Sequence, residues 1–426
     1  MKLKRLSISN CSWVKDLDIE VRQNLILIGP NGSGKTTVLL CLEMLLDMDG
    51  QRLCESITED FIRDKTKPLL IEAVLDELSA DELTAFANEM DAQGGNELVI
   101  RLEIAMQDED VVVSHYFPRC GTRKHPTRAQ QDSIGWMLLD AQSSAMAIFD
   151  ALPNGANILA IDEPEAHLHP SSQRSLAKLL KQVAAQKIIV THSPTIAGSF
   201  EPDEIVVIRA DGSATQPRRG FLNKESSMTV RWWVGRRLEP LTAGIVIAVE
   251  GPSDRIIVNK VADVLGIDLD ERDIVVVETD GCGNMRVVES IFGSGGFNIP
   301  LFELVDEDNR EDIAARVGAD PTDLADLAAH HVFISCNDLE DEYVRAIGAK
   351  ELWEKIKAMK AFSKTAMRQC RMGPDGSPSE ADLAEFIRVR TSRKIPSALV
   401  AASLINAENA PKVQSVTRLL KALTFE

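Results

Sequence analysis

A short stretch near the start of the chain constrains its fold more than any other feature. Residues 29–37 read Gly-Pro-Asn-Gly-Ser-Gly-Lys-Thr-Thr and fit the phosphate-loop pattern G-x-x-x-x-G-K-[ST]. An apolar run at 25–28 precedes the stretch, and a helical pattern at 38–46 follows it. The sequence therefore predicts a buried strand, a loop and a helix whose free N-terminal amides face a bound phosphate. An ordinary glycine-rich turn is the alternative, but such a turn does not require the flanking strand and helix.

The residue types in this loop predict how it would hold a nucleotide. Glycines allow the main chain to wrap around an anion, Lys35 would reach the β and γ phosphates, and the hydroxyl of Thr36 would bind magnesium. The predicted nucleotide-binding residues of the loop are Gly29, Pro30, Asn31, Gly32, Ser33, Gly34, Lys35, Thr36 and Thr37.

Length and composition bound what surrounds the loop. At about 150 residues per domain, 426 residues suggest two or three domains. The net charge of -18 argues against a protein that coats nucleic acid without sequence preference, although it is compatible with an acidic metal site in a nuclease. Cysteines without a C-x-x-C pair indicate neither a zinc ribbon nor a disulfide framework. No apolar run approaches the roughly 20 residues that span a bilayer, and residues 1–10 do not resemble a signal peptide, so we expect a cytoplasmic protein without a membrane partner.

Two later strands are predicted to end in residues that suit ATP hydrolysis. The apolar run 158–161 leads directly into Asp162 and Glu163, and the run 187–191 leads into His192. Beside a phosphate loop, Asp162 would hold the magnesium ion and its water shell, and Glu163 would polarise the attacking water. His192 would contact the γ phosphate. An acidic turn and a surface histidine are the simpler explanations of each segment alone, but they do not account for the order of all three.

This order of motifs resembles that of the ABC-like and SMC-like ATPases, and the segment 163–170, Glu-Pro-Glu-Ala-His-Leu-His-Pro, especially resembles the OLD (overcoming lysogenization defect) nucleases. The resemblance implies an ABC-type P-loop ATPase domain whose nucleotide site is completed by a partner subunit. It is weaker at the signature motif, for which Ser143-Ser144 and Ser133-Ile134-Gly135 are degenerate candidates, and at the Q-loop, for which Gln51 is a candidate. A degenerate signature implies slow ATP hydrolysis, or ATP bound chiefly as a dimer clamp.

Composition shifts divide the rest of the chain. We expect a long helix at 133–152, and a basic loop at 118–128 that is solvated rather than in contact with DNA. Residues 210–220 are rich in turn-forming and polar residues, which indicates a boundary, and the aromatic and basic run at 231–237 suits linker packing better than contact with a nucleic acid strand. The predicted domains are 1–212, a linker at 213–243, 244–345, and a mostly helical C-terminal part at 346–426.

Three further strands are predicted to end in acidic or glycine-rich tips. These strands and the tips that follow them are 245–249 with Glu250 and Asp254, 274–277 with Gly281-Cys282-Gly283-Asn284, and 301–305 with Asp306 and Asp308. The ends of parallel strands meet at one edge of a sheet, where Glu250, Asp306 and Asp308 would bind a divalent metal through oxygen ligands. Helix caps explain single acids of this kind, but they do not explain the joint pattern.

The spacing of Glu-Gly after one strand and Asp-x-Asp after a later one resembles the Toprim domain of topoisomerases, primases and OLD nucleases. The resemblance to OLD nucleases implies two metals, with Glu250 taking part in catalysis as well as in metal binding. In the acidic run 338–342 it favours Glu340 as the second-metal ligand, with Asp338 and Glu342 as alternatives, although a charged helical face explains this run equally well. In the basic segment 393–396 it implies that Lys394 stabilises charge on the scissile phosphate.

Together these motifs predict an α/β chain in which an ABC-type P-loop ATPase domain is followed by a Toprim domain, a parallel α/β fold, with a helical C-terminal region. The resemblance implies an ATP-regulated DNA endonuclease that uses Mg²⁺, or Mn²⁺ at the Toprim site, because two metals would activate water for phosphodiester hydrolysis. It also implies a role in bacterial anti-phage defence, a homodimer or higher homo-oligomer, and a companion defence protein or retron.

Other functions remain open on the sequence. One alternative is an SMC-like repair or clamping ATPase with a non-cutting Toprim half, and another is an ATP-controlled RNA or tRNA nuclease. A topoisomerase is disfavoured because the chain has only two tyrosines, Tyr116 and Tyr343, and neither lies in a recognisable DNA-gate domain. A bacterial-type primase is disfavoured because it would usually add a zinc-binding cysteine cluster.

Overall fold

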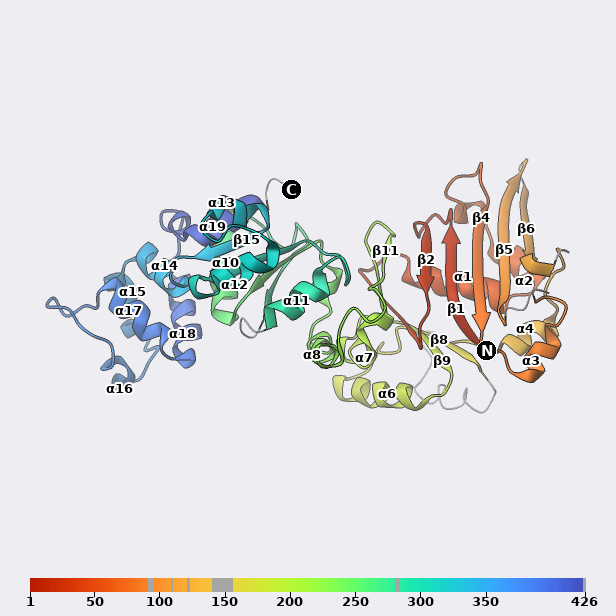
Figure 1. Ribbon diagram of the computed structural model, residues 1–426, viewed down its shortest axis with the longest axis horizontal. Helices are drawn as coiled ribbons and strands as arrows, with labels where there is room; N and C mark the ends of the chain where they lie inside the picture. The colour runs from red at the N-terminus through yellow and green to blue at the C-terminus, as the bar shows by residue number, and fades with distance from the viewer. Residues whose placement is uncertain (91–95, 109, 121–122, 140–155, 280–283, 424–426) are drawn as a thin grey trace. The chain divides into compact units, whose positions relative to one another are not determined.

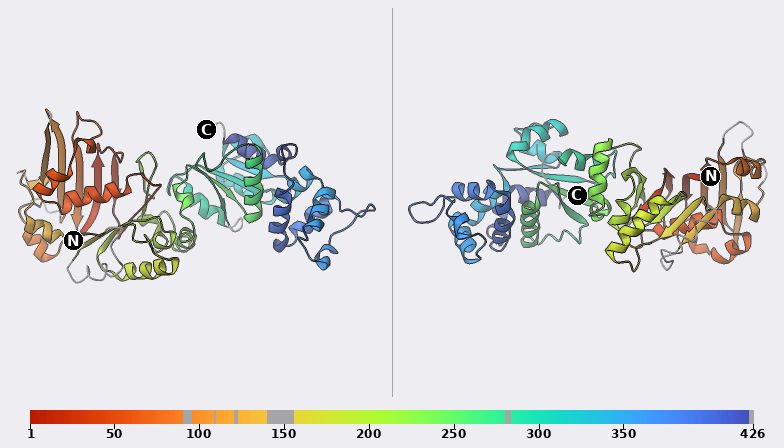
Figure 2. Two further views of the ribbon diagram at one scale, coloured as in Figure 1. Left: turned by 180° about the vertical axis from the view of Figure 1, so that it is seen from behind. Right: turned by 90° about the horizontal axis from the view of Figure 1, so that it is seen from below.

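The computed structural model describes residues 1–90, 96–108, 110–120, 123–139, 156–279 and 284–423. The chain forms two compact units, whose helices and strands are shown in Figures 1 and 2. The first unit comprises Met1–Thr242 with Gly295–Phe297, and the second comprises Ala243–Ser294 with Asn298–Glu426.

Two sheets form the first unit. One is antiparallel with the strand order β2-β1-β4-β5-β6, and the other has the order β11-β10-β3-β9-β8-β7, in which every pair except β10 with β11 is parallel. The strands of the first sheet are β1 (Lys2–Ser9), β2 (Leu17–Glu20), β4 (Leu69–Asp76), β5 (Leu98–Gln107) and β6 (Asp110–Tyr116). The strands of the second are β3 (Leu25–Ile28), β7 (Trp136–Leu139), β8 (Ile158–Asp162), β9 (Gln186–Val190), β10 (Ile205–Ile208) and β11 (Ala214–Thr215).

Helix α1 (Lys35–Leu46) packs against strands of both sheets and lies across the antiparallel one (Figure 1). It is apolar on nearly every side, and 8 of its 12 side chains are buried. A helix with this pattern belongs in a core and not on a surface, so the helix that follows the phosphate loop is fixed on both faces. The other helices of the first unit are α2 (Gly50–Ser56), α3 (Ala80–Ala85), α4 (Arg128–Ile134), α6 (Pro170–Gln182), α7 (Pro194–Ala197), α8 (Lys224–Val234) and α9 (Glu239–Thr242).

The prediction of a long helix at 133–152 is wrong where the structure describes this segment. Helix α4 ends at Ile134, and Gly135 follows it with a φ of 68°. This left-handed conformation, which glycine adopts without strain, ends the helix. The chain then enters β7, which pairs in parallel with β8, and residues 140–152 of the predicted helix lie outside the described residues.

The segment expected as a linker, 213–243, contains regular structure. Strand β11 pairs with β10 in the second sheet, and helices α8 and α9 follow it. Contacts group this segment with the first unit as far as Thr242. The second unit begins at Ala243, close to the start predicted for the Toprim domain.

The second unit contains the predicted parallel sheet, with the strand order β13-β12-β14-β15. Its strands are β12 (Ile245–Val249), β13 (Ile274–Glu278), β14 (Leu301–Asp306) and β15 (Val332–Ser335). They are mostly apolar, apart from buried Glu303 within β14, because helices cover both faces of a parallel sheet. In register, Val249 lies beside Leu304, and Asp306 lies beside Ser335, so the ends of these strands meet at one edge.

Helices complete the second unit and form the predicted helical C-terminal region. They are α10 (Pro252–Val264), α11 (Met285–Phe292), α12 (Arg310–Val317), α13 (Leu324–Ala329), α14 (Leu339–Ile347), α15 (Ala349–Ala358), α16 (Lys364–Met367), α17 (Glu380–Arg388), α18 (Thr391–Ala402) and α19 (Gln414–Ala422). Side chains of α10, α14, α17, α18 and α19 share one apolar core with the sheet. In the part of the chain that the structure describes, none of the helices has the length and apolar character needed to cross a membrane.

Candidate functional sites

The phosphate loop joins the end of β3 to the start of α1, as its pattern predicts. Two of its glycines sit where a side chain has no room. A Cβ atom at Gly29 would lie 2.1 Å from the carbonyl oxygen of Ile208, and one at Gly34 would lie 2.5 Å from that of Trp13. Both glycines also have positive φ angles, 154° and 98°. The loop conformation therefore depends on glycine at these two positions.

Lys35 is buried within the loop and points its ammonium group back over it. Its Nζ donates hydrogen bonds to the carbonyl oxygens of Gly29, at 3.0 Å, and Pro30, at 2.8 Å. Burial lowers the pKa of Lys35, while the nearby charges of Glu163 and Asp162 oppose this shift. A cation held in this way by the loop's own carbonyls lies where a phosphate would bind.

Asp162 closes the same site from the end of β8. Burial raises the pKa of this carboxyl, and a hydrogen bond from the Thr36 hydroxyl opposes that effect. The Oδ1 atom of Asp162 is buried without a hydrogen-bond partner. A hydroxyl and an unpartnered carboxylate oxygen side by side match the hard oxygen ligands that magnesium prefers, so the structure brings together two residues that fit this ion.

Glu163 and His192 come from the ends of two adjacent parallel strands, β8 and β9. The main-chain NH of Glu163 donates to the carbonyl of Val190 at 2.9 Å, and Nε2 of His192 lies 3.6 Å from Oε1 of Glu163. Glu163 has a φ of 46°, a left-handed conformation that is strained for a residue with a side chain. Such strain clusters at functional positions, so the conformation accords with the role predicted for Glu163.

Sequence reasoning missed Glu165, two residues further on. Its carboxylate accepts hydrogen bonds from the Thr191 hydroxyl at 2.8 Å and from the main-chain NH groups of His192, at 2.5 Å, and Ser193, at 3.1 Å. The residue stands inside the Glu-Pro-Glu segment, but no spacing rule separates it from a solvated acid, because its partners lie in the loop that follows another strand, β9.

The candidates for the signature motif and the Q-loop gain no such support. Ser133 lies in the last turn of α4, where its hydroxyl donates to the carbonyl of Ala129 at 2.8 Å. A helix C-terminus presents carbonyl oxygens, which repel phosphate. Gln51 donates to Glu55 along the exposed surface of α2. The other signature candidate, Ser143-Ser144, lies outside the described residues.

In the second unit, Glu250 and Asp306 stand at the ends of the adjacent strands β12 and β14. Oε1 of Glu250 accepts a hydrogen bond from the Asn309 side chain at 2.8 Å. Oδ1 of Asp306 accepts one from the main-chain NH of Leu339 at 3.3 Å. The parallel sheet thus brings these two carboxylates to one edge, as the strand pattern predicts.

Asp254, in the first turn of α10, joins this group of acids. Its Oδ2 accepts the main-chain NH of Gly251 at 2.9 Å. Burial raises the pKa of Asp254 to about 7, and the charge of Glu340 adds to the effect. Burial likewise raises the pKa of Asp306 to about 9, with further contributions from Glu250 and Asp254. These half-buried carboxylates repel one another, an arrangement that a bound cation would relieve.

Glu340 and Lys394 come from different helices, α14 and α18, and meet beside these acids. Glu340 is 1% exposed, and Nζ of Lys394 lies 3.2 Å from its Oε1. Apart from this ion pair with Lys394, neither carboxylate oxygen of Glu340 has a hydrogen-bond partner. Burial lowers the pKa of Lys394, but the charges of Glu340, Asp254 and Asp306 outweigh it, so the pKa is raised overall and the ammonium stays protonated.

The other acids of the run 338–342 have structural partners. Asp338 caps α14 by accepting the NH of Asp341 at 2.8 Å and also pairs with Arg388. Glu342 accepts the NH of Cys336 at 3.0 Å and both the NH, at 3.0 Å, and the hydroxyl, at 2.9 Å, of Ser415. Glu340 is therefore the member of the run with an unpartnered carboxylate oxygen, Oε2, near Asp254 and Asp306.

Asp308 differs from the other predicted metal ligands because it is exposed, and it accepts a hydrogen bond from the Asn309 side chain at 3.0 Å. Of the glycine-rich tip at 281–284, only Asn284 is described, and its side chain donates to the carbonyl of Thr279.

The donor set at this edge fits a hard divalent cation. It consists of carboxylates, and Oε2 of buried Glu340 has neither a hydrogen bond nor an ion pair. Within the described ranges, no three His, Cys, Asp or Glu side chains are already arranged to hold a metal ion. The residues therefore suit a divalent cation by their chemistry.

Tyr343 lies on α14, one turn after Glu340. It is 1% exposed, and its hydroxyl has no hydrogen-bond partner. Burial, with the charges of Glu340 and Asp254, raises the pKa of this hydroxyl well above its ordinary value. A buried phenol that stays protonated cannot act as the exposed nucleophile of a topoisomerase.

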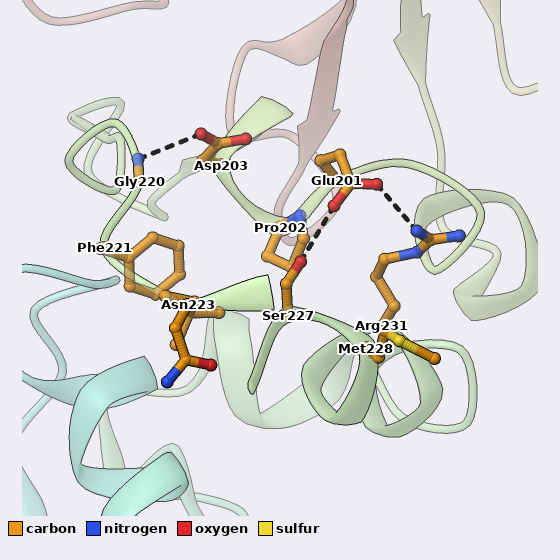
Figure 3. Close-up of a pocket in the computed structure, with 10 residues that line it drawn as sticks. Glu201, Pro202, Asp203, Gly220, Phe221, Asn223, Ser227, Met228 and Arg231 are labelled. Atoms are coloured by element: carbon orange, nitrogen blue, oxygen red, sulfur yellow. Dashed lines mark hydrogen bonds and ion pairs between the residues drawn. The ribbon is translucent and has the colours of Figure 1, made fainter. Parts of the chain in front are cut away.

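A pocket of about 430 Å³ in the first unit contains none of the predicted site residues (Figure 3). Glu201 lines it and accepts hydrogen bonds from Ser227, at 2.9 Å, and from Arg231, at 2.7 Å. Glu201 and Arg231 neutralise each other and Asp203 adds a negative charge, so the pocket has no net positive charge with which to bind a phosphate. We assign it no ligand.

Family models match both halves of the chain. Models described as an AAA domain and an AAA ATPase domain match residues 5–133 and 142–197. A model described as the TOPRIM domain of overcoming lysogenization defect protein-like sequences matches residues 241–308.

Individual proteins resemble parts of the chain. An OLD nuclease from Thermus scotoductus is 30% identical over 195 residues, which make up 42% of this chain and 36% of that nuclease. A putative ABC transporter ATP-binding protein from Gloeobacter violaceus is 28% identical over 208 residues, 46% of this chain and 79% of that protein.

Solved structures cover similar portions. The C-terminal region of the Xanthomonas campestris pv. campestris OLD protein covers 44% of this chain and 97% of its own length, with 23% identity and a TM-score of 0.35. The SMC head domain from Thermotoga maritima covers 50% of this chain and 97% of its own length, with 13% identity and a TM-score of 0.36. From the family matches and the motifs in the structure, the chain joins an AAA-type P-loop ATPase region to an OLD-like TOPRIM domain.

Proposed function

We propose that this chain is an ATP-controlled, divalent-metal-dependent endonuclease that cuts DNA. The observation that carries the proposal is the group of half-buried, mutually repelling carboxylates at the strand ends of the second unit, beside buried Glu340 and Lys394. The match to an OLD-like TOPRIM model over the same strands supports phosphodiester cleavage as the reaction. The phosphate loop in the same chain supports control by a nucleotide.

Glu250, Asp254, Asp306 and Glu340 would hold the metal ions in this proposal. When bound, such ions activate a water and stabilise the attacking and leaving oxygens of a phosphodiester. Glu340 holds the ammonium group of Lys394, which would stabilise charge on the scissile phosphate. Exposed Asp308 would add an oxygen ligand at the open side of the group.

In the first unit, the loop amides and Lys35 would bind the nucleotide phosphates, while Thr36 and Asp162 would hold magnesium. Glu163 would orient the attacking water and His192 would contact the γ phosphate. Because these groups lie in a different compact unit from the carboxylates, ATP would act as a regulator of DNA cleavage and not as part of its chemistry.

Nicking of supercoiled plasmid tests the proposal. The wild-type chain is incubated with Mg²⁺ or Mn²⁺, with and without ATP, beside Glu250→Gln, Asp306→Asn and Lys35→Ala. We expect the first two substitutions to lower cleavage by about 100-fold or more, since even outer-shell partners of metal ligands change activity by about 10- to 100-fold. We expect Lys35→Ala to change the response to ATP while metal-dependent cleavage continues.

Glu278 provides the matched control. It also ends a strand of the same sheet, β13, but it pairs with Arg255 at 3.2 Å. Glu278→Gln should cut plasmid at the wild-type rate. Cleavage that survives Glu250→Gln would contradict the site assignment. No cleavage of DNA by the wild-type chain in any condition would favour an SMC-like clamping ATPase, or an RNA nuclease if RNA is cut instead.

The defence role and the oligomeric state belong to the same proposal. We expect cells that produce the chain to reduce phage plaque formation, and Glu250→Gln and Lys35→Ala each to abolish this protection. We expect ATP to favour a homodimer, because in ABC-like ATPases the partner subunit completes the nucleotide site. Light scattering with and without ATP measures this directly, and unchanged mass would contradict the dimer.

A further inference from the structure

We infer that Glu165 is a positioning residue of the nucleotide site, which sets His192 and Glu163 in place for ATP hydrolysis. The inference rests on the proposed ATPase function of that site and adds a residue that the motif pattern does not assign. Its basis is the set of hydrogen bonds that the Glu165 carboxylate makes across two strand ends.

All three hydrogen bonds go to one short loop. The Thr191 hydroxyl donates to Oε2 of Glu165 at 2.8 Å, and the main-chain NH groups of His192 and Ser193 donate to Oε1 at 2.5 Å and 3.1 Å. A carboxylate that accepts several NH and OH groups is a strong anchor, since charge-assisted hydrogen bonds are about twice as strong as neutral ones. The loop that carries His192 is therefore fixed on both sides of this residue.

The segment that carries Glu165 also carries Glu163, so the anchor acts on both. Nε2 of His192 lies 3.6 Å from Oε1 of Glu163, too far for a strong direct bond to hold the pair. Glu163 is also strained, with its φ of 46°. Its conformation persists only if neighbouring contacts determine it. These contacts are the hydrogen bond from the NH of Glu163 to the carbonyl of Val190 and the hydrogen bonds of Glu165, two residues later.

A second side chain extends the same link. The Ser193 hydroxyl donates to Gln173 at 2.8 Å, and Gln173 in turn donates to the carbonyl of Leu168 at 3.1 Å. The loop after β9 is thus tied to the segment after β8 at two places. Glu165 makes the contact next to the proposed catalytic groups, and Gln173 makes the other contact from helix α6.

Glu165→Ala and Glu165→Gln, in the full chain, test the inference. Alanine removes all three hydrogen bonds, and we expect kcat for ATP hydrolysis to fall by about 10- to 100-fold, the cost of a small misplacement of reacting groups. The KM for ATP should stay within about twofold, because the phosphate loop is untouched. Glutamine keeps an oxygen for both NH groups and should retain kcat within about threefold. Asp49→Ala, which removes a carboxylate that accepts two main-chain NH groups at the start of α2, serves as the control.

The outcomes separate the inference from the proposed function. A wild-type chain that does not hydrolyse ATP overturns the proposed ATPase, and with it the positioning role. If the wild type hydrolyses ATP and Glu165→Ala does so at the same rate, the inference alone is wrong. If Glu165→Ala weakens binding of a fluorescent ATP analogue as much as it lowers kcat, or if Glu165→Gln is as slow as Glu165→Ala, the hydrogen-bonded placement of the loop is not what Glu165 supplies.

Discussion

Replacing Lys394 with methionine removes the positive partner of a buried carboxylate. Glu340 is 1% exposed and lies 3.2 Å from Nζ of Lys394. At an effective dielectric constant of about 20, two unit charges at this distance attract by about 5 kcal/mol. Breaking one side of a buried pair costs about 3–5 kcal/mol in measured cases. Because the Lys394 side chain is 29% exposed, solvent screens part of the attraction between the two charges. We therefore expect the free energy of unfolding to fall by about 3 kcal/mol, the lower end of the measured range.

Glu340→Gln should cost less. It removes one of several mutually repelling charges, and Lys394 keeps Asp254 and Asp306 as counter-charges. In the double variant the unpaired carboxylate is gone, so its loss should be smaller than the sum of the two single losses. We expect an interaction energy of about 2 kcal/mol, within the range that residues in direct contact show.

Urea unfolding of the full chain at pH 7.5, with a chelator present, measures these energies. Lys357→Met is the control, because Lys357 pairs with Glu354 on the exposed surface of α15 and should contribute less than about 1 kcal/mol. Adding Mn²⁺ should restore more stability to Lys394→Met than to the wild type, since a cation would replace the lysine. Single losses that add within about 0.5 kcal/mol would refute the reasoning, because they would show that the two charges do not interact.

Three further predictions concern other parts of the structure. Gly34→Ala places a Cβ atom 2.5 Å from the carbonyl oxygen of Trp13, whereas Gly32→Ala meets nothing within 4 Å, although both positions have positive φ. We therefore expect Gly34→Ala to weaken binding of a fluorescent ATP analogue by about tenfold or more. Gly32→Ala should lower the free energy of unfolding only by the backbone strain of about 1 kcal/mol. Equal affinities of the two variants for the analogue would contradict this reasoning. Burial lowers the pKa of His115 from 6.5 to about 4, so between these values the unfolded chain binds more protons than the folded chain, and stability falls as the pH falls. Relative to His115→Gln, the wild type should lose about 1 kcal/mol between pH 7.5 and 5.5 in urea unfolding, and parallel pH profiles would show that His115 is not buried as a neutral group. Glu342→Gln weakens three hydrogen bonds that tie α14 to Cys336 and Ser415, so it should lower the free energy of unfolding by about 1–3 kcal/mol while plasmid cleavage continues. Loss of cleavage without loss of stability would instead make Glu342 a functional acid.

The sequence was sufficient to predict which residues end the strands. Apolar runs that stop abruptly at Asp162, Glu250 and Asp306 predicted both the strands and the residues at their tips, and the structure has strands at all three places. The reason is physical. A buried strand leaves a mostly apolar run, interrupted in β14 by buried Glu303, and the charged residue at its end marks where the chain reaches the edge of the sheet.

The choice among neighbouring acids depended on contacts that no local pattern contains. Asp338, Glu340 and Glu342 alternate in one acidic run, yet their partners lie on α17, α18 and α19, far along the chain. Glu165 escaped notice for the same reason, because its three partners stand in the loop after a different strand, β9. The helix predicted at 133–152 failed because Gly135 ended α4 and the next residues added a strand to a sheet formed by distant segments.

The buried position of α1 limits how the first unit can respond to a nucleotide. A helix with 8 of 12 side chains buried, in contact with both sheets, cannot tilt or slide without repacking a close-packed core. The helix that carries the phosphate loop residues Lys35 and Thr36 is therefore held in place. A change of shape that accompanies binding or hydrolysis is easier in the loops that end β8 and β9, which the hydrogen bonds of Glu165 join to each other.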